Sequence, residues 1–305
     1  STMKRTKNPA KEAEYRKRAA DLVAQMTLHE KVSQMLSWAP AIERLGIPAY
    51  NWWSEGIHGV GRAGTATVFP QAIGMAAAFD EDMMEQVGNA VGVEARGKYN
   101  MCRAHGDRDI FKGLTVWAPN INIFRDPRWG RGHETYGEDP FLTSRLGVRF
   151  VEGMQGNDPD YLQAAACAKH FAVHSGPESD RHHFNAIVSK QDLWETYLPA
   201  FRALVKEAGV EAVMGAYNRT NGEPCCGSKT LLKDILRDKW HFDGHVTSDC
   251  WAIKDFHTGH MVTDGPVESV ALAVNNGCDL NCGDLYVYLE QAVAEGKLSE
   301  EKIDE

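Results

Sequence analysis

The sequence predicts an α/β fold, most simply a (β/α)8 barrel of the TIM type with some irregularity. Short apolar runs alternate with longer amphipathic segments, which is typical of parallel strands joined by helices. The chain has 305 residues, enough for one barrel domain over residues 1–305. No GxGxxG or P-loop motif follows a predicted strand. This argues against the alternative, an open doubly wound sheet.

The predicted elements follow one another along the chain. Residues 1–36 read as helix, interrupted where Thr27 and Glu30 fit a capping box. Asp80 and Ser189 are each placed to cap a helix. The remaining predicted helices lie at 141–154, 231–240, 267–275 and 285–294. The predicted strands are the apolar runs at 114–123, 164–173, 210–217, 245–248 and 278–280.

Polar residues gather where these predicted strands end. They are Asn120 to Arg125, Lys169-His170, Tyr217-Asn218, Ser248-Asp249 and Asp279. A single polar residue after a strand means little, because turns favour Asn and Asp. Five strands that end in this way are harder to attribute to turns. In a barrel the carboxyl ends of the strands carry the active site.

Composition and charge exclude several classes of function. With 33 basic and 42 acidic residues the net charge is −9, which argues against nucleic acid as a partner. No apolar run is long enough for a membrane helix, and the N-terminus has no apolar signal core. The seven cysteines do not follow a zinc-binding pattern. Chemistry at a glycosidic bond needs only carboxylates, so for such a reaction we expect neither a metal nor an organic cofactor. A neutral substrate such as a sugar is compatible with this composition.

Asp249 is the strongest candidate for a catalytic residue. It ends a short β run, and a carboxylate held there could attack an anomeric carbon. Trp251, two residues later, could stack on a sugar ring. Taken alone, this segment favours Asp249 as the cap of the helix that follows. Lys169 and His170 would supply hydrogen-bond donors for sugar hydroxyls, although a surface lysine beside a structural histidine fits as well.

Two loops add further candidates. The segment 51–59 combines two tryptophans with Glu55, which suits the rim of a sugar site. The charged segment 124–140 reads mainly as a loop held by ion pairs, including Arg131 and Glu134. Arg125 lies nearest the strand end, so we place it at the substrate.

These segments together resemble glycoside hydrolase family 3, and most closely its β-xylosidase-type members. The matching motifs are WWSEGIHG (52–59), RDPRWGR (125–131), YGEDP (136–140), AKHF (168–171), GAYN (215–218), TSDC (247–250) and LNCG (280–283). The resemblance implies a retaining, exo-acting β-xylosidase or β-glucosidase that acts on terminal β-linked sugars. It also implies a glycosyl-enzyme on Asp249, with Glu55, Arg125, Lys169, His170 and Tyr217 binding the sugar. Glu55 stands where many β-glucosidase members carry an aspartate.

The resemblance also raises the question of the proton donor. In most of the family this acid/base belongs to an α/β sandwich domain after the barrel, which we expect to be absent from this chain. A second domain or a partner chain would then complete the site, and the chain alone would be weak or inactive. A β-N-acetylglucosaminidase branch instead uses a barrel histidine with an aspartate, to which His182 and Asp180 correspond. We expect Arg181 and His182 to bind substrate or to hold the loop instead.

Two other functions remain open on the sequence. The chain could be a non-catalytic sugar-binding barrel, or a barrel enzyme such as an aldolase with Lys169 as a Schiff-base amine. The paired motifs around Asp249 disfavour the aldolase. The family resemblance is compatible with a secreted or periplasmic protein, and the sequence does not decide the compartment. The sugar, the linkage and the oligomeric state also stay undetermined.

Overall fold

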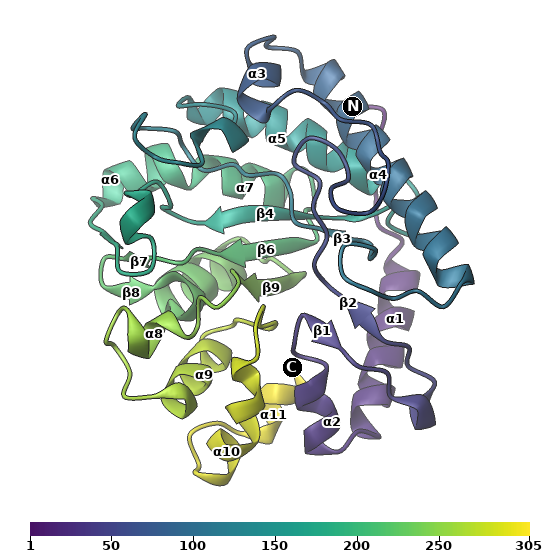
Figure 1. Cartoon of the computed structure of the whole chain (residues 1–305), viewed down its shortest axis with the longest axis vertical. Coiled ribbons are helices and arrows are strands. Elements are labelled where there is room, and N and C mark those ends of the chain that lie inside the picture. The colour runs from purple at the N-terminus through teal and green to yellow at the C-terminus, as the bar shows by residue number, and fades with distance from the viewer.

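Four parallel strands form the centre of the molecule, in the spatial order β3-β4-β6-β9 (Figure 1). The computed structural model describes residues 1–305. The strands are β3 (Thr115–Val116), β4 (Ala165–Phe171), β6 (Ala212–Gly215) and β9 (His245–Ser248). Each strand lies within a predicted apolar run, and helices join them in sequence. The predicted alternation of strands and helices is therefore confirmed.

The two edges of this sheet are joined to each other. Backbone bridges link Ser54 to β3, and link residues 279–281 to β9 and to Leu36. Between these segments, β1 (Trp38–Ala39) pairs with β2 (Tyr50–Asn51) in antiparallel orientation. The chain therefore forms an irregular barrel of the predicted class. An open doubly wound sheet would leave its edges apart.

Helices cover the outside of the barrel. The longer ones are α1 (Pro9–Ala24), α4 (Glu81–Ala104), α5 (Pro140–Gln155), α7 (Pro199–Lys206), the π-helical η6 (Lys229–Lys239) and α9 (Pro266–Asn275). The shorter ones are α2 (Leu28–Ser33), α3 (Ala72–Ala76), α6 (Lys190–Asp192), the π-helical η4 (Leu193–Tyr197), α8 (Asp255–Thr258), α10 (Leu289–Ala294) and α11 (Glu300–Asp304). Because α2 contacts α10 and α11, the second helix lies beside the last two (Figure 1). None of these helices has the length and apolar character needed to cross a membrane.

The remaining elements are short. They are the strands β5 (Asn185–Ala186), β7 (Arg219–Thr220) and β8 (Glu223–Pro224), and the 3-10 turns η1 (Glu43–Leu45), η2 (Gly132–Glu134), η3 (Glu178–Asp180), η5 (Cys225–Gly227) and η7 (Leu285–Tyr288). The three predicted helix caps are all present. Thr27 and Glu30 form the capping box of α2, Asp80 accepts the Met83 N–H, and Ser189 accepts a backbone N–H in α6.

Glycines allow the two longest outer helices that touch, α4 and α5, to approach closely. A Cβ added at Gly88 of α4 would clash with the carbonyl oxygen of Phe150 in α5. Around this crossing Met84, Val91 and Phe150 are fully buried. The close approach fixes α5, which leads directly into β4. The strand ends that carry Lys169, His170 and Asp249 are thus built on a tightly packed scaffold.

Candidate active site

Asp249 follows the last residue of β9 and lies almost entirely out of solvent, with 8% of its surface exposed. Its Oδ1 accepts a hydrogen bond from the Cys250 N–H at 2.8 Å. Its Oδ2 has no hydrogen-bond partner within the chain. The side chain caps no helix, because the next helix, α8, begins six residues later. The helix-cap interpretation is therefore wrong, and one carboxylate oxygen is left available.

Burial and nearby charges act on Asp249 in opposite directions. Burial raises the pKa of Asp249 above its usual value. Arg131, the Cys250 N–H, Lys169 and Tyr217 all lower the pKa again, because each favours the carboxylate. The net shift is upward, so these four groups offset only part of the cost of burial. Without these groups, the buried carboxyl group of Asp249 would be far more difficult to ionise.

His170 sits beside the free oxygen of Asp249 as a neutral imidazole. Its Nδ1–H donates to Asn122 Oδ1 at 3.0 Å, and its Nε2 accepts from Arg131 Nη1 at 3.1 Å. The same Nε2 lies 3.7 Å from Asp249 Oδ2. Burial, with Arg131 next in importance, lowers the pKa of His170 well below its usual value. The ring is therefore a fixed neutral wall of the site.

Lys169 and Glu134 complete the charged groups around Asp249. Lys169 is buried at the end of β4, and no carboxylate lies within ion-pairing distance of its ammonium group. Glu134 pairs with Arg131 at 2.7 Å and accepts a hydrogen bond from Asn120. Burial works to raise the pKa of Glu134, but Arg131 and Lys169 outweigh it, so the pKa is lowered. Glu134 is thus held as a carboxylate.

The arginine that reaches the site is Arg131, which the sequence had suggested belongs to a structural loop. The expected ion pair of Arg131 with Glu134 is present, but Arg131 also contacts His170 and lowers the pKa of Asp249. Arg125, placed at the substrate from the sequence, donates to the Tyr197 hydroxyl at 2.7 Å and lies over that ring. Its contact with a sugar stays a prediction. No sequence signal had placed Arg131 beside Asp249.

Glu55 opens onto a pocket that it shares with Arg131 and Glu134. Its Oε1 accepts a hydrogen bond from the Trp53 indole N–H at 2.7 Å. Trp53 in turn stacks on Trp117, with ring centroids 5.3 Å apart. The aromatic rings therefore fix the carboxylate of Glu55 from behind, and leave it facing the pocket beside Arg131.

Tyr217 is held between Asp249 and a loop that carries Arg181 and His182. The Arg181 guanidinium lies over the Tyr217 ring, 5.2 Å from its centroid, and the His182 ring lies 4.9 Å away. The pairing of His182 with Asp180, considered from the sequence, does not form. His182 Nδ1 instead lies 2.7 Å from Asp255 Oδ2. Asp180 is exposed and lies 3.8 Å from His183.

A disulfide joins Cys250 to Cys282, next to the candidate nucleophile. Trp251 follows in the left-handed backbone region, with φ of 67°, and its N–H donates to the Cys282 carbonyl at 2.8 Å. Half of its side chain is exposed, and its ring packs on Gly283. Trp251 is therefore a fixed aromatic surface beside Asp249. Nothing in the spacing of the cysteines predicted this disulfide.

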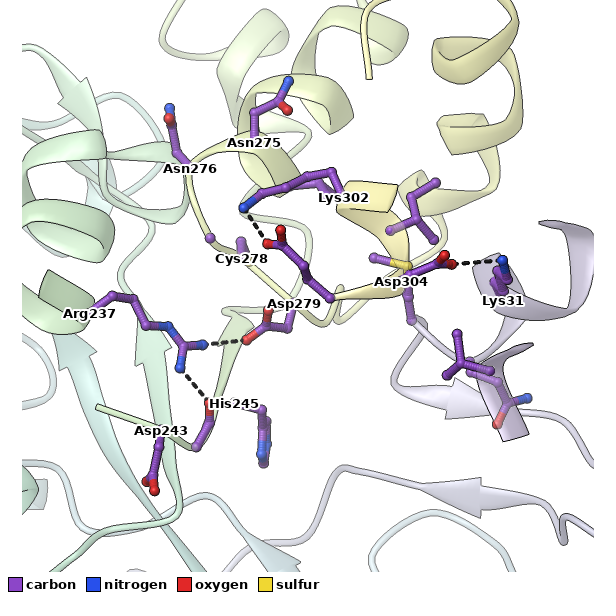
Figure 2. Close-up of a pocket in the computed structure, with 18 of the residues that line it drawn as sticks. Lys31, Arg237, Asp243, His245, Asn275, Asn276, Cys278, Asp279, Lys302 and Asp304 are labelled. Atoms are coloured by element: carbon purple, nitrogen blue, oxygen red, sulfur yellow. Dashed lines mark hydrogen bonds and ion pairs between the residues drawn. The ribbon is translucent and has the colours of Figure 1, made fainter. Parts of the chain in front are cut away.

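A pocket of about 820 Å³ lies at the opposite end of the barrel, around the amino ends of the strands. Figure 2 shows Asp279 there, paired with Arg237 at 2.8 Å. The placement of Asp279 at a carboxyl strand end is therefore wrong. No residue of the Asp249 site lines this pocket. No group of three or more His, Cys, Asp or Glu side chains is arranged to hold a metal.

Comparisons with known proteins agree with this geometry. Residues 18–305 match the N-terminal domain of glycosyl hydrolase family 3. The chain is 50% identical over 295 residues to a xylan 1,4-β-xylosidase of Xylanibacter ruminicola, covering 95% of this chain and 34% of that protein. It is 44% identical to a probable β-D-xylosidase 7 of Arabidopsis thaliana, covering 94% of this chain and 39% of the relative. The chain thus spans little more than a third of the length of these relatives.

Solved structures show the same similarity. A GH3 exo-β-xylosidase (XlnD) in complex with a xylobiose aziridine activity-based probe matches with a TM-score of 0.88 and 35% identity, covering 94% of this chain and 38% of that one. A β-glucosidase from Listeria innocua in complex with isofagomine matches with a TM-score of 0.79 and 29% identity, covering 94% and 44%. The family match over nearly the whole chain shows that this protein belongs to glycoside hydrolase family 3.

Proposed function

We propose that this chain carries the nucleophile and the sugar-binding site of a retaining, exo-acting β-glycosidase of the xylosidase type. One observation carries the proposal. Asp249 presents a free carboxylate oxygen at the carboxyl end of the barrel, surrounded by Arg131, Lys169, His170 and Tyr217. Such a group can attack an anomeric carbon, and its neighbours can hold the hydroxyls of the sugar.

In the first step, an oxygen of Asp249 forms a bond to the anomeric carbon while the bond from that carbon to the leaving oxygen breaks. The electron pair of the broken bond goes to the leaving oxygen, which takes up a proton unless it is a stable anion. The oxygen of a water molecule then bonds to the anomeric carbon and loses a proton to a base or to solvent, while the bond to Asp249 breaks and its electron pair returns to the carboxylate. Arg131 and Lys169 support both steps, because they favour Asp249 as an anion before attack and after release.

His170, Glu134 and His182 have no proton to give to the leaving group. His170 is neutral, and its Nδ1–H is committed to Asn122. Arg131 holds Glu134 in its carboxylate form. His182 directs its Nδ1 to Asp255 and accepts a hydrogen bond from Arg181 at Nε2. The geometry thus disfavours the β-N-acetylglucosaminidase-like alternative. A donor outside these residues must protonate an ordinary leaving group.

Similarity to proteins named as xylosidases supports a xyloside as the substrate, in preference to a glucoside. In the complete enzyme this substrate would be the terminal residue of a β-linked oligosaccharide. For the chain alone we expect reaction with activated leaving groups, which depart without a proton. Unactivated glycosides should react very slowly.

The test uses 2,4-dinitrophenyl 2-deoxy-2-fluoro-β-D-xyloside, whose leaving group needs no proton. We expect the protein to gain one fluoroxylosyl group, located by peptide mass spectrometry on Asp249, and the Asp249→Ala variant to gain none. The glucose-configured reagent should label more slowly. Binding of xylose without labelling would instead support a non-catalytic sugar-binding barrel. Trapping of Lys169 by borohydride with a carbonyl substrate would support an aldolase.

A further inference from the structure

We propose that Asp255 and His182 form a positioning pair that holds Arg181 and Tyr217 in the arrangement that receives the sugar. This inference rests on the proposed function, because it assigns a task within the same site. Neither residue touches the nucleophile. Both are therefore positioning residues, which act through Arg181 and through Tyr217, the ring beside Asp249.

The first observation is the hydrogen-bond sequence through His182. Its Nδ1 lies 2.7 Å from Asp255 Oδ2, and a carboxylate can only accept, so Nδ1 carries the proton. Its Nε2 is then an acceptor, and it receives the Arg181 Nε–H at 3.2 Å. The carboxylate of Asp255 thereby fixes both the tautomer and the orientation of the ring, and the ring fixes Arg181.

The second observation is the burial of Asp255. Only 7% of this residue is exposed, and no lysine or arginine lies within ion-pairing distance of its carboxylate. Burial raises the pKa of Asp255, while the hydrogen bond from His182 lowers it. His182 is the one side chain that hydrogen-bonds this buried carboxylate, and the nearby His183 and Arg181 lower its pKa further. Asp180, on the same loop as His182, is exposed and has no comparable role.

The third observation links this pair to the site. Arg181 lies over the Tyr217 ring at 5.2 Å, and the His182 ring meets the same ring at 4.9 Å with a 68° tilt. Tyr217 is itself nearly buried and lowers the pKa of Asp249. Movement of the loop would therefore displace Arg181 and loosen the ring that stands beside the nucleophile.

Packing of the backbone gives an independent sign that this loop is anchored on α8. Gly259 follows the end of α8, and a Cβ added there would clash with the carbonyl oxygen of His182. The φ of Gly259 is −119°, so alanine suits its backbone. Substitution at this position tests the contact between loop and helix, and leaves the charges unchanged.

The experiment compares Asp255→Ala, Asp255→Asn and Gly259→Ala with the wild type. Asp180→Asn is the matched control, because it also removes an aspartate charge beside a histidine on this loop. The fluoroxyloside labelling rate is resolved into an inhibition constant, KI, and a maximal rate, kinact. Hydrogen exchange of the backbone of residues 176–184 and the affinity for xylose are measured on the same proteins.

For Asp255→Ala we expect KI to rise about 10-fold or more and kinact to change less than about 3-fold, because the sugar is held less well while the nucleophile stays in place. Asp255→Asn should recover part of the loss, since an amide oxygen still accepts from His182. Gly259→Ala should resemble Asp255→Ala, and both should speed exchange of the loop. Asp180→Asn should match the wild type.

An unchanged KI in Asp255→Ala would overturn the proposal, and so would an equal loss in Asp180→Asn. If Asp255→Ala is labelled more slowly and its backbone exchanges faster along the whole chain, the variant has lost stability in general. That result would also contradict the proposal. If the wild type binds xylose but is not labelled, the proposed glycosidase function fails. Weaker xylose binding and a less protected loop in Asp255→Ala would then still support the positioning pair.

Discussion

Replacing Arg131 with methionine should raise the pKa of Asp249 and shift the acid limb of the labelling reaction to higher pH. Arg131 Nη1 lies 3.1 Å from His170 Nε2, which lies 3.7 Å from Asp249 Oδ2. The guanidinium and the carboxylate are therefore at most about 6.8 Å apart. At an effective dielectric constant of about 20, unit charges at that distance interact by roughly 2.4 kcal/mol, equivalent to about 1.8 pKa units.

The sign follows from the ionisation that the reaction needs. Asp249 attacks as a carboxylate, so the rate falls as the pH drops through its pKa. Burial has already raised this pKa, and Arg131 works against that rise. Arg131 is partly exposed, so solvent screening reduces the full Coulomb value. We expect the acid limb in Arg131→Met to move upward by about 1 to 2 pH units, with a smaller loss of rate above it.

The assay is the rate of Asp249 labelling by the fluoroxyloside, followed by intact-protein mass across the acidic and neutral range. Arg128→Met is the control, because Arg128 belongs to the same loop but is exposed and pairs with Asp126. Arg131→Met leaves Glu134 without its cation, so the double variant with Glu134→Gln is measured as well. An acid limb that stays in place in both Arg131 variants would refute the assigned role of Arg131.

Two further predictions concern the stability of the scaffold. Replacing Cys250 and Cys282 with serine opens a loop closed over 32 residues. This change should lower the free energy of unfolding by about 4 kcal/mol, and equal urea midpoints for variant and wild type would contradict it. Gly88→Ala should destabilise the protein by about 1 to 3 kcal/mol because of the clash with Phe150. Gly97→Ala, in the same helix with open space around it, should stabilise it by about 0.5 to 1 kcal/mol.

The sequence predicted the elements that depend on local patterns. The four regular parallel strands coincide with apolar runs, and the caps at Thr27, Asp80 and Ser189 depend on residues three or four positions apart. Interactions between residues so close in the chain can be predicted directly from the sequence. The lengths of the strands were predicted less accurately than their positions. The run at 114–123 contains only the two strand residues of β3, and Pro119, which has no N–H, interrupts the regular pairing.

The choice between Arg125 and Arg131 could not be made from sequence distance. Arg125 is nearer to the strand, but the chain turns away from the barrel there and η2 brings Arg131 back. Gly132 makes this return possible, because a Cβ at that position would clash with the Phe124 ring. Such a contact depends on the path of a whole loop. Spacing along the chain therefore did not reveal that Arg131 lies beside His170 and Asp249.

Register was the other property that local patterns could not supply. The last predicted strand was only three residues long, so its amino and carboxyl ends could not be distinguished. The bridge between Thr247 and Leu280 fixes the register, and it places Asp279 toward the amino end. The same register brings Cys250 beside Cys282. Both results required knowledge of which residues face each other across two strands.

The balance of charge around Asp249 limits which group can complete the reaction. Arg131 and Lys169 offset Asp249 and Glu134, while His170 is neutral, so these five groups carry no net charge. A carboxylic acid that approaches this site meets the anion of Asp249, which raises its pKa and keeps its proton available. Once Asp249 has bonded to the sugar, that anion is gone and the pKa of the acid falls. The same acid is then suited to accept a proton from water. The arrangement on the barrel would thus tune the pKa of the donor during the reaction, and an activated substrate, which needs no donor, would not depend on this effect.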